Sequence, residues 1–206
     1  MAVAQALSRL VKNGELERVE KGLYYKTRKT RFGALRPDAN ALLAEVLNAK
    51  QGYVTDNAAY NSFGITTQVP GTIIIAANCY RSPRKIGGLT IRYRRSKVKS
   101  NTASPEILQL LDALRAIKRI PDATVDQVLT RVIEIVDGFT LAKKSELVTC
   151  ALEYNPSVRA LVTAIFDLWF KGIDISALAH SLNPLSSYKI GISSHILPNK
   201  TKWKIK

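Results

Sequence analysis

The chain of 206 residues is 46% hydrophobic, which is enough to bury a core in one large or two small domains, and its net charge of +15 indicates a polyanionic partner. Two cysteines, Cys79 and Cys150, are too few and too far apart for a disulfide framework or a zinc site. Because neither a signal peptide nor a membrane-spanning apolar run is present, we expect a cytoplasmic protein with no membrane partner. Since no metal-ligand spacing and no cofactor-binding motif occurs either, we expect no metal and no cofactor.

The positive charge is concentrated in three segments. Residues 1–36 carry +6, residues 81–100 carry +8 and residues 187–206 carry +5, whereas residues 37–80 and 101–186 each carry −2. This distribution favours separate binding surfaces over a uniformly basic protein. The alternative is that the segments are solvated charged faces.

The first 30 residues predict a short helix followed by a hairpin. Apolar residues recur at helical spacing on one face of residues 3–12, at Val3, Leu7, Leu10 and Val11. Asn13-Gly14 is typical of a helix end, and residues 16–19 and 23–26 alternate around a turn at 20–22. A helix joined to a basic hairpin is the reading half of a winged helix-turn-helix, so nucleic-acid recognition is the leading hypothesis.

On this hypothesis two groups of side chains contact DNA. The polar face of the helix enters the major groove with Gln5, Ser8, Arg9 and Lys12. The hairpin and the residues after it contact phosphates or the minor groove with Arg18, Lys21, Lys26 and Arg28. The alternative is that the basic residues only solubilise an exposed helix.

Residues 27–95 predict a mixed α/β segment. We expect a linker over 27–33, a helix over 38–50, a short strand over 52–55 and a brief helix ending near 63–64. Residues 71–78 are continuously apolar, which indicates a buried strand, and residues 81–88 read as a turn. Residues 89–95 alternate, with Leu89, Ile91 and Tyr93 predicted to point inward and Thr90, Arg92 and Arg94 outward.

A second basic patch lies around this last strand. It comprises Arg81, Arg84, Lys85, Arg92, Arg94 and Arg95. Arg92 and Arg94 share one strand face, so their charges repel unless a phosphate backbone, an RNA or an acidic protein lies against them. The alternative is a charged edge strand that prevents aggregation.

The second half of the chain predicts helices. Ser104-Pro-Glu is a strong helix start, and helices follow over about 104–119, 122–137, 140–153, 156–171 and 174–182. The predicted fold class is therefore α+β. It comprises a partial winged helix over 1–30 and a second domain over 31–206, with an α/β part at 31–100, a helical part at 104–182 and an extended basic tail at 183–206.

The residues do not indicate an enzyme. His180 and His195 lack metal-ligand spacing, and no phosphate-binding glycine loop or nucleophile elbow occurs. Glu15 and Glu17 have the spacing of paired carboxylates, but they lie in the predicted hairpin, where they would repel phosphate.

Six segments spread along nearly the whole chain resemble a known family. They are Ala6-Leu-Ser-Arg-Leu-Val-Lys-Asn-Gly-Glu-Leu16, Lys21-Gly-Leu-Tyr-Tyr25, Thr30-Arg-Phe-Gly33, Gly64-Ile-Thr-Thr-Gln-Val-Pro70, Lys85-Ile-Gly-Gly-Leu89 and Leu182-Asn-Pro-Leu-Ser-Ser-Tyr-Lys-Ile-Gly191. These strings are similar to those of AbiEi-type antitoxins and transcriptional regulators of bacterial abortive-infection (type IV) toxin–antitoxin loci. The resemblance implies a winged helix that binds operator DNA and represses its own operon. It also implies a C-terminal antitoxin domain that opposes a nucleotidyltransferase-type toxin without forming a stable complex with it.

One feature departs from the winged-helix pattern. A complete motif has two helices before the recognition helix, whereas Met1 lies almost at the start of the predicted one. We expect either a shortened chain or a motif that has lost half its parts. The alternative function is a protein-interaction or RNA-binding module that uses the basic patch around 81–99 and the helical half.

Overall fold

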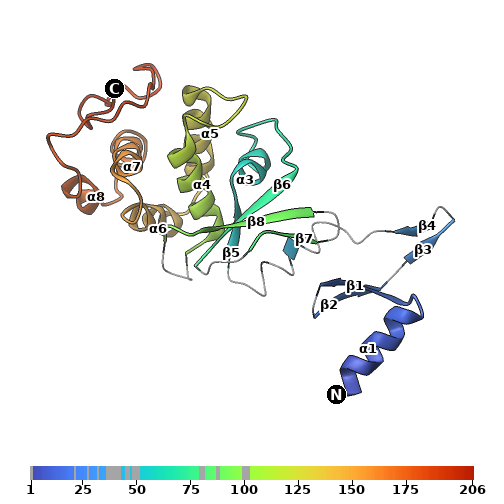
Figure 1. The fold of residues 1–206 in the computed structure, drawn as a ribbon. Helices are drawn as coiled ribbons and strands as arrows, with labels where there is room; N and C mark the ends of the chain where they lie inside the picture. The colour runs from blue at the N-terminus through green and yellow to red at the C-terminus, as the bar shows by residue number, and fades with distance from the viewer. Residues whose placement is uncertain are drawn as a thin grey trace.

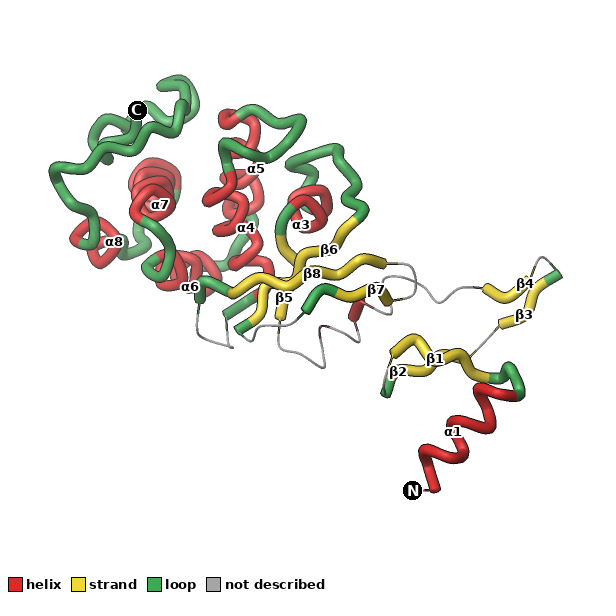
Figure 2. The backbone as a smooth tube through the Cα atoms, in the orientation of Figure 1, coloured by secondary structure: helices red, strands yellow, loops and turns green. Residues whose placement is uncertain are grey.

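The computed structural model describes residues 2–20, 22–26, 28–31, 33–35, 43–44, 47, 52–78, 82–86, 89–98 and 103–206. The fold is α+β, as predicted, with a helix and two hairpins first, then a four-stranded sheet, then helices (Figure 1). Figure 2 shows the sheet between the N-terminal hairpins and the C-terminal helices.

The N-terminal part consists of helix α1 (Ala2–Lys12) and two antiparallel hairpins, β1 (Leu16–Glu20) with β2 (Leu23–Lys26), and β3 (Arg28–Thr30) with β4 (Gly33–Leu35). The predicted linker over 27–33 is wrong where β3 and β4 form. Their ladder pairs Arg28 with Leu35 through the backbone, and such pairing does not require apolar alternation in the sequence.

Gly14 ends α1 and turns the chain into β1. Its φ of 73° is left-handed, its N–H donates to the Val11 carbonyl at 3.1 Å, and the Glu15 N–H donates to the Leu10 carbonyl at 3.0 Å. These two bonds form a Schellman motif, which favours glycine at this position. The helix and the first hairpin are therefore joined by a defined turn.

A winged helix is not established by the structure. The part of the chain described holds α1 and the first hairpin, but no second helix packed against α1. In Figure 1 α1 lies at the far end of the molecule, away from the helices of the C-terminal half.

The four-stranded sheet has the order β5-β6-β8-β7. β6 (Thr72–Ala77) is antiparallel to β5 (Gly52–Thr55) and parallel to β8 (Leu89–Arg95), which in turn is antiparallel to β7 (Arg84–Ile86). The strands predicted over 52–55, 71–78 and 89–95 are confirmed. The predicted turn over 81–88 is corrected at 84–86, which forms the edge strand.

Both faces of this sheet are covered. One face packs on α3 (Asn57–Ser62) and α4 (Pro105–Ala116), which contribute to the main core. On the other face Ile75 and Ile91 are packed against Leu43 and Leu47. These two leucines belong to the helix predicted over 38–50, most of which lies outside the described residues.

The second half of the chain forms helices where the sequence predicts them. The helices are α4, α5 (Val125–Asp137), α6 (Leu141–Ala151), α7 (Pro156–Trp169) and α8 (Ser176–His180), so the five predicted helices are confirmed with ends shifted by a few residues. Proline opens α4 and α7, and Thr124 forms a capping box with Gln127 at the start of α5.

The C-terminal tail folds back on the helices instead of running extended along them. Tyr188 forms an isolated bridge with Ile205, and its N–H donates to the Lys204 carbonyl at 2.8 Å. Ile192 and Leu197 are at most 2% exposed. The Ser- and Lys-rich composition led to the extended prediction, but these few apolar residues suffice to join the tail to the core.

Candidate nucleic-acid interface

Helix α1 presents the residues predicted to read DNA. No residue of α1 is buried. Each of the four polar side chains predicted for the major groove is exposed: Gln5, Ser8, Arg9 and Lys12. Their spacing of three and four residues places them along one side of the helix, so the structure brings this group together.

The first hairpin separates its cations from one of its acids. Arg18 pairs with Tyr24 and Lys26 pairs with Leu16, so both basic residues, which are exposed, lie on one face of the ribbon. Glu17 pairs with Tyr25 on the other face, where the Tyr25 hydroxyl donates a hydrogen bond to its carboxylate. The Glu17 carboxylate is therefore directed away from the Arg18 and Lys26 face.

Lys21 and Arg28 were also predicted to contact DNA, but the structure does not place them on the hairpin face that carries Arg18 and Lys26. Lys21 lies outside the described residues, and Arg28 belongs to β3 of the following hairpin, where it pairs with Leu35.

The second basic patch is not one surface. On β8, Arg92 and Arg94 share a face with Thr90, which pairs with Lys85, whereas Arg95 lies on the opposite face. Arg84 pairs with Ile91, and Arg81 lies outside the described residues. Lys85, Arg92 and Arg95 are exposed. The patch is thus divided between the two faces of the sheet.

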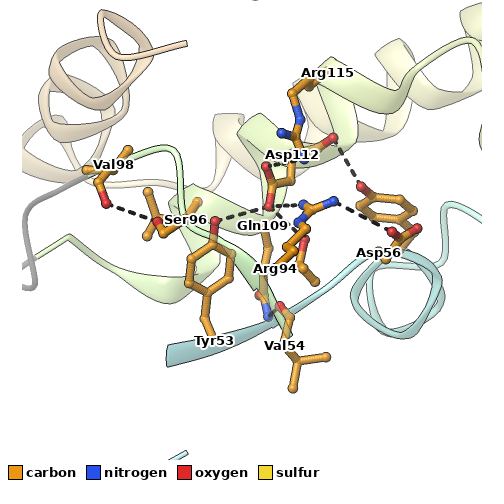
Figure 3. A network of polar contacts seen from close by, with 12 residues as sticks. Tyr53, Val54, Asp56, Arg94, Ser96, Val98, Gln109, Asp112 and Arg115 are labelled. Atoms are coloured by element: carbon orange, nitrogen blue, oxygen red, sulfur yellow. Dashed lines mark hydrogen bonds and ion pairs between the residues drawn. The ribbon is translucent and has the colours of Figure 1, made fainter. Parts of the chain in front are cut away.

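The prediction that Arg94 points to solvent is wrong. Its Nη2 atom lies 2.5 Å from Oδ2 of Asp112, a residue of α4 that is 1% exposed (Figure 3). The same guanidinium donates to the Thr55 hydroxyl at 2.8 Å and lies 3.6 Å from the Asp56 carboxylate. The anion that faces Arg94 is therefore supplied by this chain.

Further donors complete the environment of Asp112. The Tyr53 and Thr55 hydroxyls donate to Oδ2 at 3.0 and 2.6 Å. On the other oxygen, Arg115 Nη2 lies 3.2 Å away and the Tyr154 hydroxyl donates at 3.3 Å. Both oxygens of this buried carboxylate are therefore satisfied by hydrogen bonds and ion pairs.

The network raises the pKa values of Tyr53, Tyr154 and Arg94, which favours the protonated form of each. Burial and the nearby Asp112 charge raise the pKa of Tyr53 to about 12 and also raise the pKa of Tyr154. Burial alone would lower the pKa of Arg94, but the Asp112 charge raises it overall. The network links β5, β8, α4 and the residues after α6, and its polar atoms contact one another, so we assign it a structural role.

The sequence did not identify Asp112 or Arg115 as candidate site residues. Only Asp112 has a signal in the sequence, and that signal is weak. Asp112 is a lone acid inside the apolar run Leu110-Leu-Asp-Ala-Leu114, where a buried charge needs a partner. Nothing in the sequence indicates that the partner is Arg94 on a strand.

In the part of the chain that the structure describes, no three His, Cys, Asp or Glu side chains are grouped to hold a metal ion. No helix among the same residues is both long and apolar enough to cross a membrane.

Comparison with known proteins places the chain in a family. Residues 1–145 match the model of a family of unknown function, DUF6088, and because this match covers more than half of the chain, the protein belongs to that family. No curated protein and no solved structure gave a significant match.

Proposed function

We propose that this protein is a DNA-binding transcriptional regulator that acts as antitoxin and autorepressor in an AbiEi-type toxin–antitoxin system. The observation that carries the proposal is the exposed polar face of α1, which the Gly14 turn joins to a hairpin with Arg18 and Lys26 on one face. Operator DNA is the partner whose chemistry fits both parts.

The side chains of α1 suit base edges. Arginine and lysine pair with guanine O6 and N7, glutamine pairs with adenine, and a good bidentate contact contributes about 1–3 kcal/mol of discrimination. Arg9, Lys12 and Gln5 supply these donors from one helix face. The absence of buried residues in α1 leaves this face accessible to a groove.

The hairpin suits the phosphate backbone. Arg18 and Lys26 place two cations on one face beside α1, and a phosphate contact of this kind fixes the register of a reading helix without carrying sequence information. Such contacts release counterions, so binding weakens as salt rises.

The antitoxin part of the proposal rests on the resemblance of the six segments to AbiEi-type proteins. In that family the regulator represses its own operon and opposes a nucleotidyltransferase-type toxin without a stable complex. We assign the second activity to residues 31–206 of this chain.

Fluorescence anisotropy of the duplex upstream of the protein's own gene tests the DNA-binding proposal, with a shuffled duplex as control at two salt concentrations. We expect tighter binding to the upstream duplex, and Arg9→Ala should weaken that binding by roughly 5- to 150-fold, which corresponds to about 1–3 kcal/mol. Arg9→Ala should weaken binding to the shuffled duplex by a smaller factor.

Lys171→Ala is the matched control, because it removes one exposed positive charge outside the hairpin and α1. It should change both affinities by less than about twofold. Equal binding to both duplexes would contradict the repressor proposal. If Arg9→Ala had no effect and Lys85→Ala or Arg92→Ala did, the interface would lie on the sheet, as in the alternative of an RNA- or protein-binding module.

A further inference from the structure

A basic cavity lies in the helical half, away from α1 and the hairpins. It has a volume of about 450 Å³, within the range of small-molecule sites, and lies between the end of α4, the start of α7 and the tail. Its walls are formed by Leu114, Arg115, Ile117, Lys118, Arg119, Ser157, Tyr188, Lys189 and Ile190.

The charge of this cavity is of one sign. Four of its lining residues are basic and none of those described is acidic. Arg115 is paired with Asp112, but none of the ion pairs between described residues involves Lys118, Arg119 or Lys189. Lys118 Nζ donates to the Lys189 carbonyl at 3.2 Å, which holds the two lysines together without neutralising them.

The location at the end of α4 explains only part of this charge. Basic side chains near a helix C-terminus are stabilised by the helix dipole, which accounts for Lys118 and Arg119. Lys189 comes from the tail, more than 60 residues later, and the folding of the tail brings it to the same cavity. An anion at this place would reduce the repulsion among the three cations.

The cavity also has an apolar part. Ile117 and Ile190 are each 4% exposed and line it. A ligand with several acceptor oxygens suits the exposed basic side chains of the same walls, those of Lys118, Arg119 and Lys189.

We infer that this cavity binds a small organic phosphate of nucleotide size, with the phosphate near Lys118, Arg119 and Lys189 and the uncharged part against Ile117 and Ile190. The inference is independent of DNA binding by α1, because the two sites share no residue.

Isothermal titration calorimetry of the full chain with ADP, adenosine and inorganic phosphate tests this inference. We expect ADP to bind more tightly than inorganic phosphate, which lacks the part that contacts the isoleucines, and adenosine not to bind. Lys189→Glu should weaken ADP binding at least about tenfold, because it places a negative charge beside the phosphate.

Lys171→Glu is the matched control, since it makes the same charge change at an exposed site outside the cavity. It should leave ADP affinity within about twofold, and circular dichroism should show that both variants fold. No heat from ADP at millimolar concentration, or equal losses in the two variants, would overturn the inference. ADP binding no tighter than that of inorganic phosphate would overturn the assignment of a nucleotide-sized ligand.

Discussion

At the scale of single residues, Asp112 is the position at which we expect replacement to be most costly. Asp112→Ala leaves Arg94 and Arg115 beside the core without their shared anion, and removing one partner of a buried ion pair costs about 3–5 kcal/mol. Urea unfolding followed by circular dichroism measures this loss.

Asp137→Ala serves as the control for Asp112→Ala, because its side chain is exposed on α5. The free energy of unfolding of this control should lie within about 0.5 kcal/mol of that of the unaltered protein. Similar unfolding midpoints for the two variants would show that Asp112 does not link the strands to α4.

The tyrosines around Asp112 give a prediction about pH. The folded state raises the pKa of Tyr53 from 10 to about 12, so the folded state holds its proton more strongly than the unfolded state does. This stabilisation is present below pH 10 and is lost as pH rises through about 12. Burial raises the pKa of Tyr60 and of Tyr154 in the same direction.

An alkaline titration of tyrosinate absorbance should therefore show two steps. The later step is the ionisation of Tyr53, Tyr60 and Tyr154, because the folded state raises their pKa values, and it occurs together with the loss of helical circular dichroism. In Tyr53→Phe the second step should lose about a third of its amplitude. A single step with the helices intact would contradict the buried network.

The inward direction of the Arg94 side chain was not predictable from the sequence. Alternation along 89–95 assigned Arg94 to solvent, because an alternating strand is usually covered on one face only. Here Ile91 packs on one face while α4 covers the other, so a polar position also faces the interior. The partner is a single acid on a helix, and no spacing rule connects the two.

At the scale of elements, the C-terminal tail offers the clearest test. Ile205 is 2% exposed, so Ile205→Ala removes a buried side chain and should destabilise the protein by about 2–5 kcal/mol in a urea titration. Leu185, in the same tail, is 96% exposed. If Leu185→Ala were as costly as Ile205→Ala, the tail would not be packed as the structure has it.

Elements with local signals were predictable and those formed by long-range pairing were not. Three of the five helices in the second half have clear start signals in the sequence: Ser104-Pro-Glu for α4, Thr124 for α5 and Asn155-Pro156 for α7. The β3–β4 hairpin and β7 were missed, since short basic segments pair through the backbone and carry no apolar pattern. The packing of the tail depends on contacts with distant helices.

At the scale of the whole molecule, the proposed functions lie in different parts of the chain. The surface proposed to read DNA lies on α1 and the β1–β2 hairpin, and the cavity proposed to bind an organic phosphate lies between α4, α7 and the tail. The helix and hairpin of the first surface were predictable from local sequence. The cavity was not, because Arg119 and Lys189 are 70 residues apart and meet only in the folded chain.

Hydrogen–deuterium exchange of the full chain, with and without the duplex upstream of its own gene, tests the central claim most directly. An 11-residue helix without buried residues opens readily in solution, so its amides should exchange fast without DNA. We predict slower exchange in α1 and the β1–β2 hairpin with the upstream duplex, and little change with a shuffled duplex at the same salt concentration. Protection confined to β7–β8 or to the helical half, or equal protection by both duplexes, would contradict the claim that α1 reads operator DNA.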